Sequence, residues 1–376
     1  MDLETIAAGL SGLGQVRLEA EACIRGKSPW VKCSNCQEVC PVNGIDLGTG
    51  RPGLTDCQRC GLCAVACPAG ALEDPERTHS FFLARGREAI AAAGQAVFAC
   101  NRSREEKRKD NWILAACLGA VAPEVMIALA VRGKVVFLYQ QEECAACPWG
   151  KKGAGVFRAS FERAQKALAA MNLPADRLVQ RATVAPATSG SPAGGKATVP
   201  AAMGRREFFR SLIRGIRIPG VDPPPARATP LVSQRRSLIL RQALQEARPE
   251  GGYPAGATLH LASLELAGPC YLCNICSRLC PTGALELDGG ELKYTPARCN
   301  HCDLCLAVCP QHSLVRGADL TLEAIVKAST ITLATAVEHH CAGCGETFQA
   351  STTATECLRC LFNHNLAGSV SGGGGA

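Results

Sequence analysis

Residues 270–310 read CYLCNICSRLCPTGALELDGGELKYTPARCNHCDLCLAVCP and contain one cysteine pattern twice, C-x2-C-x2-C-x3-C-P. The first three cysteines of each motif are two residues apart, so their thiols lie on one tight loop. The fourth follows on a short helical turn that points away from this loop, and the proline after it redirects the chain. The spacing therefore predicts two metal-binding quartets that exchange their last ligand.

These motifs resemble those of bacterial ferredoxins with two [4Fe–4S] clusters. Apolar and polar residues alternate on both sides of residues 288–290, which predicts a β-hairpin between the motifs. The alternative is a pair of zinc knuckles, and two matching quartets that both end in Cys-Pro argue against it. The exchange gives a first C-terminal quartet and a second C-terminal quartet: Cys270, Cys273, Cys276 and Cys309, and Cys280, Cys299, Cys302 and Cys305.

A related but imperfect unit lies in residues 23–68. Its second motif is complete, and its first motif has Trp30 where the opening cysteine should stand. The same exchange of ligands predicts one complete quartet and one that is a thiol short. The complete set, the second N-terminal quartet, is Cys40, Cys57, Cys60 and Cys63, and the short set is Cys33, Cys36 and Cys67.

Cys23 is the unassigned cysteine near this gap. The chain between Cys23 and Cys33 contains Gly26 and Pro29, which suit a loop back to the open position. Its spacing also resembles the first motif of a group of proteobacterial polyferredoxins that begin C-x-R. We expect Cys23 to complete the first N-terminal quartet with Cys33, Cys36 and Cys67. The alternative is a three-cysteine site that holds [3Fe–4S] or a cubane with a labile iron.

The middle of the chain predicts a small α/β layer. Apolar runs end in Cys100 and Cys117, residues 122–133 have helical periodicity, and the strand-like residues 134–140 lead to a C-x2-C pair. Cysteines at strand ends would gather at the carboxyl edge of the sheet. The pattern resembles the delta-type iron–sulfur subunit that links hydrogenases to heterodisulfide reductases. The resemblance implies a [2Fe–2S] cluster on the middle quartet: Cys100, Cys117, Cys144 and Cys147. The alternative is that these cysteines are small buried hydrophobic residues.

The last four cysteines follow the spacing C-x2-C-x12-C-x2-C, with Gly345 after the second cysteine. This spacing predicts a tetrahedral zinc ribbon. A single-iron site of the rubredoxin type is the alternative. With this ribbon quartet all 24 cysteines are assigned. Its members are Cys341, Cys344, Cys357 and Cys360.

The expected fold class is α+β and multidomain, with two bacterial-type ferredoxin folds flanking a small α/β domain and a zinc ribbon at the C-terminal end. Pro, Ala, Gly and Ser dominate the region between the α/β domain and the second ferredoxin unit, which is typical of a linker. The predicted segments are 1–80 (ferredoxin), 81–178 (α/β), 179–235 (linker with an amphipathic Arg-rich helix), 236–330 (ferredoxin), 331–366 (zinc ribbon) and 367–376 (disordered tail).

Charge and hydropathy narrow the class of protein. The formal net charge is +7, but thiolate ligands of four clusters and one zinc ion would bring it to about −3. Basic composition is therefore poor evidence for nucleic-acid binding, which we do not expect. No stretch approaches the roughly 20 apolar residues of a membrane span. Two acids in the first four residues do not suit a signal sequence. Reduced, metal-ligating thiols then favour the cytoplasm.

The function expected from these motifs is electron transfer without a substrate site of its own. No phosphate-binding glycine loop or paired catalytic carboxylates can be identified. The order of the segments resembles that of four-cluster 4Fe–4S proteins found beside proteobacterial formate dehydrogenases and other molybdoenzymes. The resemblance implies a redox enzyme of the formate dehydrogenase, molybdoenzyme or hydrogenase type as partner. The alternative is an accessory iron–sulfur protein that matures a molybdoenzyme. The oligomeric state stays open.

Overall fold

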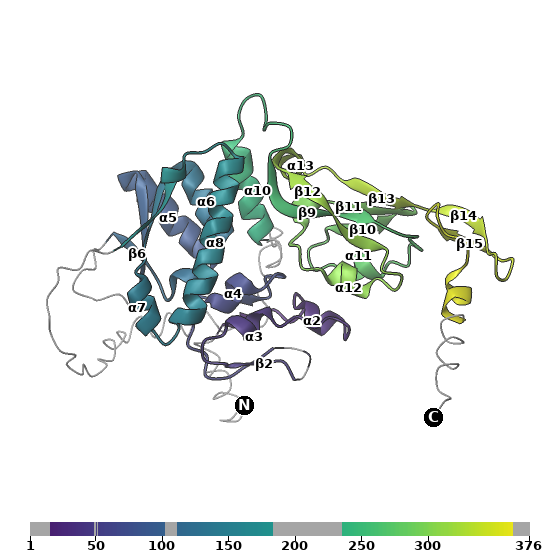
Figure 1. The fold of residues 1–376 in the computed structure, drawn as a ribbon, viewed down its shortest axis with the longest axis horizontal. Coiled ribbons are helices and arrows are strands. Elements are labelled where there is room, and N and C mark those ends of the chain that lie inside the picture. The colour runs from purple at the N-terminus through teal and green to yellow at the C-terminus, as the bar shows by residue number, and fades with distance from the viewer. Residues whose placement is uncertain (1–15, 49, 51, 102–110, 183–234, 364–376) are drawn as a thin grey trace, which may run out of the picture. The chain divides into compact units, whose positions relative to one another are not determined.

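The computed structural model describes residues 16–48, 50, 52–101, 111–182 and 235–363 (Figure 1). They belong to one unit, formed by residues 1–183 and 231–376. The predicted Arg-rich helix, nearly all of the predicted linker and the predicted tail lie outside the described residues. Within the described ranges, no helix has both the length and the apolar character needed to cross a bilayer.

The N-terminal cysteines lie on short helices and on the loops next to them, in a region with two small antiparallel strand pairs, β1 with β4 and β2 with β3. Helices α3 and α4 end directly before Cys40 and Cys67. Each of these cysteines precedes a proline, which disfavours the helical backbone at that position. The elements are β1 (Arg17–Leu18), α2 (Ile24–Lys27), α3 (Asn35–Val39), β2 (Ile45–Asp46), β3 (Gly53–Leu54), α4 (Leu62–Ala66) and β4 (Leu72–Glu73).

The middle region contains a four-stranded parallel sheet with the order β6-β5-β7-β8. The strand–strand–helix–strand order predicted from the sequence is present. A long helix, Gly150–Ala170, follows the C-x2-C pair. The elements are α5 (His79–Ala93), β5 (Gln95–Cys100), β6 (Trp112–Ala115), η2 (Leu118–Ala120), α6 (Pro123–Arg132), β7 (Lys134–Leu138), α7 (Gln141–Ala146), α8 (Gly150–Ala170), η3 (Ala175–Arg177) and β8 (Leu178–Arg181).

The C-terminal cysteines lie beside a long antiparallel pair, β9 with β12, and the predicted hairpin, β10 with β11. Gly289 and Gly290 form the hairpin turn with φ values of 58° and 76°, which glycine adopts without a steric cost. The elements are α10 (Arg235–Ala247), β9 (Thr258–Leu266), α11 (Ile275–Leu279), β10 (Leu285–Asp288), β11 (Glu291–Tyr294), η5 (Pro296–Arg298), α12 (Leu304–Val308), β12 (Leu314–Thr321), α13 (Leu322–Lys327), β13 (Ile331–Thr335), β14 (Val337–His340) and β15 (Thr347–Ala350).

The main hydrophobic core joins the middle region to elements that follow residue 234. Helix α10 buries Ala243 and Leu244 against α6, and α13 adds Leu322 to the same core. Figure 1 shows α10 beside α6. The sequence predicts that residues 236–247 belong to the C-terminal ferredoxin segment, whereas the structure packs their apolar face against α6 of the middle region.

A second core surrounds the N-terminal cysteines. It contains Ile24, Cys36 and Cys63, and it also includes Leu304 and Val308 of α12. Helix α12 contains Cys305 of the second C-terminal quartet, and Cys309 of the first C-terminal quartet follows it directly. The two cysteine-rich regions are therefore packed together through apolar side chains.

Candidate metal centres

The first C-terminal quartet is brought together from the two ends of residues 270–310. Its four cysteines line one cavity with Leu272, Ile275 and Leu314. Burial raises the pKa of Cys276 to about 12, and the thiols of Cys270, Cys273 and Cys309 add to the rise. The last cysteine of the second motif therefore lies at the loop of the first motif.

The second C-terminal quartet lines a separate cavity. Burial raises the pKa of Cys302 to about 12, and Cys299 and Cys280 raise it further. Tyr294 of β11 is 0% exposed, and its hydroxyl has no hydrogen-bond partner of ordinary geometry among the described residues. Burial raises the pKa of this hydroxyl, as do the thiols of Cys299, Cys305 and Cys280. A buried O–H beside these thiols suits a sulfur-rich cluster that accepts its hydrogen bond.

In the second N-terminal quartet, α4 and the loop before it bring three thiols to Cys40. Burial raises the pKa of Cys60 to about 11, and Cys40 and Cys57 add to this. Burial also raises the pKa of Cys63, with Cys60, Cys57, Cys36 and Cys40 adding to the rise. Cys63 is thus close to members of both N-terminal quartets.

The structure places Cys23 beside the three cysteines that lack a fourth partner. Burial raises the pKa of Cys36 to about 11, and Cys67, Cys33 and Cys23 contribute. Cys23 stands before α2 and is 7% exposed, whereas Trp30 is 70% exposed. The four thiols of the first N-terminal quartet therefore lie near one another, and the side chain of Trp30 is largely exposed to solvent.

Backbone N–H groups donate to the last cysteine of several motifs. The N–H of Gly44 lies 3.3 Å from Cys40 Sγ, and the N–H of Ala71 lies 3.2 Å from Cys67 Sγ. Such N–H···S bonds stabilise a thiolate and shift the potential of the cluster that it binds. The recurring spacing of four residues is the signal that could have revealed them.

The middle quartet lies where the parallel strands end, in a pocket of about 50 Å³ that also contains Tyr139 and Phe157. Burial raises the pKa of Cys117 to about 12, with Cys100, Cys60 and Cys144 adding to it. A Cβ on Gly153 would lie 2.6 Å from Cys117 Sγ, so α8 needs glycine there to approach the thiol. The site thus brings four thiols together around a space that a larger side chain at position 153 would partly fill.

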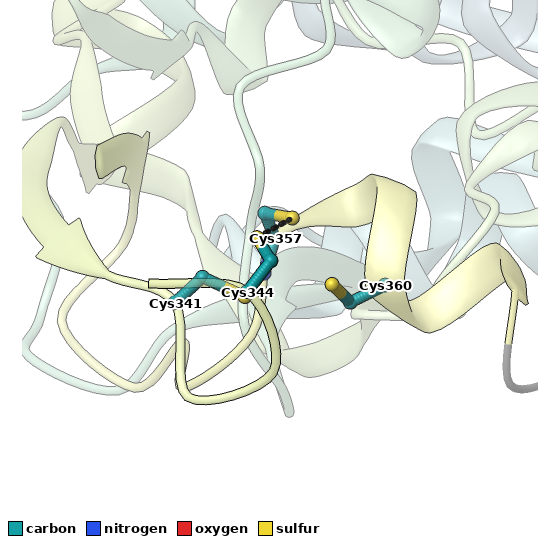
Figure 2. Close-up of side chains that lie close together, drawn as sticks. All are labelled: Cys341, Cys344, Cys357 and Cys360. Carbon is teal, nitrogen blue, oxygen red and sulfur yellow. Dashed lines mark hydrogen bonds between the residues drawn. The ribbon is translucent and has the colours of Figure 1, made fainter. Parts of the chain in front are cut away.

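The ribbon quartet has the closest arrangement. Its four sulfur atoms lie within 4.8 Å of one another, and Figure 2 shows them on the turn after β14 and at residues 357–360. Cys344 Sγ and Cys357 Sγ are 3.8 Å apart. A tetrahedral ion with Zn–S bonds of about 2.3 Å separates its sulfurs by about 3.8 Å. The quartet is therefore compatible with a zinc ribbon.

Backbone amides prepare one ribbon thiol for metal binding. The N–H of Cys357 donates to Cys341 Sγ at 3.2 Å. This bond lowers the pKa of Cys341 to about 6, with the N–H groups of Cys344 and Gly343 assisting. Deprotonated thiolates are the form that binds metals, so this lowered pKa favours ligation.

Arg236 was also missed from sequence, where it stands in a basic run. Its guanidinium donates to both carboxylate oxygens of Glu124 at 3.0 and 3.1 Å. The same group donates to the carbonyls of Val65 at 2.9 Å and Cys67 at 3.3 Å. Helix α10 therefore fastens the segment that carries a cysteine of the first N-terminal quartet.

These ligand loops define an iron–sulfur protein with two 4Fe–4S ferredoxin-type regions. Residues 269–313 match the model of the 4Fe-4S dicluster domain, and residues 54–73 match that of the 4Fe-4S binding domain. The matches support 4Fe–4S binding in both regions. They do not extend to the middle or ribbon quartets.

Two curated relatives are uncharacterized ferredoxins of Methanocaldococcus jannaschii. One is 42% identical over 55 residues, which cover 14% of this chain and 33% of the relative. The other is 46% identical over 46 residues, or 11% of this chain and 30% of the relative. The chain thus spans about a third of the length of these relatives. No solved structure matches.

Proposed function

We propose that the chain is an electron carrier with four [4Fe–4S] clusters, one in each of the two N-terminal and two C-terminal quartets. The middle quartet holds a [2Fe–2S] cluster and the ribbon quartet holds zinc. Each iron–sulfur centre supplies a one-electron couple. The protein positions these centres, sets their potentials through hydrogen bonds and burial, and has no substrate site of its own.

The proximity of neighbouring quartets, whose cysteines belong to shared hydrophobic clusters, is the observation that carries this proposal. Cys36 raises the pKa of Cys63 across the two N-terminal quartets, and Cys276 raises that of Cys305 across the two C-terminal ones. Cys60 likewise raises the pKa of Cys117 in the middle quartet. A series of adjoining quartets suits an electron path better than a set of separate structural metals.

Such a path requires donors and acceptors outside the chain. We propose a redox enzyme of the formate dehydrogenase, molybdoenzyme or hydrogenase type as partner, in the cytoplasm. Support for the partner is the order of the cysteine regions, and support for the compartment is the number of reduced thiols. Neither nucleic acid nor a membrane is part of the proposed function.

The direct test is anaerobic purification followed by iron, sulfide and zinc analysis and by an EPR-monitored redox titration. The expected content is about 18 iron atoms, about 16 in the four cubanes and about two in the middle quartet, and one zinc ion per chain. Reversible reduction and rapid reoxidation by a soluble acceptor would support electron transfer. A colourless protein with several zinc ions and no sulfide would refute the proposal. Clusters that stay silent at physiological potentials would instead favour a role in enzyme maturation.

A further inference from the structure

The ribbon is attached to the loop that begins the first C-terminal quartet. Ser351, directly after β15, donates its N–H to the carbonyl of Cys270 at 2.7 Å. The N–H of Cys270 in turn donates to Ser351 Oγ at 2.8 Å. This reciprocal pair fixes the backbone of a cluster-ligand candidate to a residue of the ribbon.

Side chains of the ribbon extend this contact. The rings of Phe348 and Tyr271 are stacked, with centroids 6.2 Å apart and planes at 19°. Leu358 lines the same cavity as the four cysteines of the first C-terminal quartet. Leu358 lies between Cys357 and Cys360, so the ribbon quartet holds both ends of the segment that presents it.

The quartet under the ribbon is also the one with the most accessible thiol. Of the cysteines in the four ferredoxin-type quartets, all within the described residues, Cys273 alone is exposed. Solvent access and hydrogen bonds near the sulfurs set the potential of an iron–sulfur cluster. A ribbon segment that shields this cavity from solvent therefore changes the reduction potential more than the same shielding of an already enclosed quartet would.

The position of the ribbon over this cavity depends on metal in the ribbon quartet. Strands β14 and β15 form a two-stranded sheet of their own. An isolated hairpin of this kind is at best marginally stable, and small structural metal sites supply the missing free energy. Without a metal, the hairpin and the segment around Leu358 are held only by the few contacts with the quartet loop described above.

We propose that metal in the ribbon quartet seats Ser351 and Leu358 over the first C-terminal quartet and thereby sets the potential of that one cluster. Ser351 is a positioning residue that acts through the backbone of Cys270. The inference rests on the proposed electron carrier, because it presumes a cluster in this quartet. Loss of the ribbon metal exposes the cavity and frees the N–H of Cys270, while the other three cubanes keep their surroundings.

The test is an anaerobic redox titration of the full chain, followed by EPR, with zinc analysis of every sample. The signal of the first C-terminal quartet is assigned by its loss in Cys273→Ser. A Cys344→Ser, Cys360→Ser double variant is expected to lose zinc and to change the reduction equilibrium of that signal about tenfold, which is about 59 mV. The other three signals keep their potentials.

Ser351→Ala tests the hydrogen bond with Cys270 separately from metal binding. It is expected to retain zinc and to shift the same signal about threefold, while Ser351→Thr, which keeps a hydroxyl, restores the potential. Thr352→Ala, at the exposed neighbouring position, is the matched control and leaves all signals unchanged.

Several results would overturn the inference. They are four unmoved potentials in the zinc-free variant, a uniform shift of all four, and a Ser351→Ala potential equal to that of the wild type. A failure of the electron-carrier proposal is distinct, because the wild-type protein itself would then contain zinc without iron and sulfide, or clusters that are not reduced at physiological potentials.

Discussion

The ion pair between Glu124 and Arg236 joins α6 to α10 in the interior, and its loss should be costly. Glu124 is 5% exposed, and the side chain of Arg236 is 13% exposed. Burial alone would raise the pKa of Glu124, but Arg236 and Arg163 lower it from 4.5 to about 2. A shift of that size corresponds to about 3 kcal/mol in favour of the folded state. Independently, removal of one partner from a buried ion pair typically lowers the free energy of unfolding by about 3–5 kcal/mol.

A double-mutant cycle measures this interaction. We expect Glu124→Ala and Arg236→Ala each to lower the free energy of unfolding, with a coupling of about 3 kcal/mol between them. The measurement is denaturant unfolding of the anaerobic protein at pH 7, followed by far-UV circular dichroism. Glu246→Ala is the matched control, since Glu246 and Arg132 form a pair of 2.8 Å at 35% and 40% side-chain exposure. That exposed pair should contribute less than about 1 kcal/mol.

The sign of the pH dependence follows from the lowered pKa. Because the folded pKa of Glu124 lies below 4.5, its stabilisation is complete above pH 4.5. It declines as the pH falls from 4.5 towards 2, and Glu124→Gln should abolish this part of the acid dependence. A coupling below about 1 kcal/mol, or an acid dependence equal in wild type and variant, would refute the reasoning.

Three further outcomes are expected. Cys23→Ser should lose one cubane or convert it to a three-iron cluster by EPR, and four unchanged cubanes would leave Cys23 without a role as ligand. Tyr294→Phe should lower the potential of the second C-terminal quartet by about 40 mV, the equivalent of a hydrogen bond of about 1 kcal/mol; an unchanged potential would contradict the O–H···S bond. Gly153→Ala should remove about two iron atoms per chain, because its Cβ would displace Cys117. Gly155→Ala on the same helix is the control. The Cβ there would meet no atom within 4 Å, so this variant should retain full iron. Equal iron in the two glycine variants would argue against a cluster in the middle quartet.

Local spacing explains why the ferredoxin-type regions could be predicted from sequence. Three thiols two residues apart must share one loop, and a proline after the fourth ends the helix there. The turn at Gly289 and Gly290 was likewise predictable, because few residues other than glycine adopt positive φ at both positions. The prediction that Cys100 and Cys117 lie together required one more assumption, because they meet only if the strands before them are parallel neighbours.

Contacts between distant segments could not be predicted in this way. The apolar face of α10 shows that it packs against something, but it does not identify α6. Arg236 and Ser351 look like ordinary polar residues, because nothing in the sequence marks their partners. These are the carboxylate of Glu124 and backbone groups far away along the chain. Tyr294 resembles any aromatic strand residue until its hydroxyl is found buried beside thiols.

The packing of α10 against α6 has a consequence for the covalent chain. Both helices belong to one core although residues 183–234 separate the middle region from α10 in sequence. A single break in the backbone between those residues would leave two fragments that share a common interior and a buried salt link. Under native conditions they should migrate together on a sizing column and part only in denaturant.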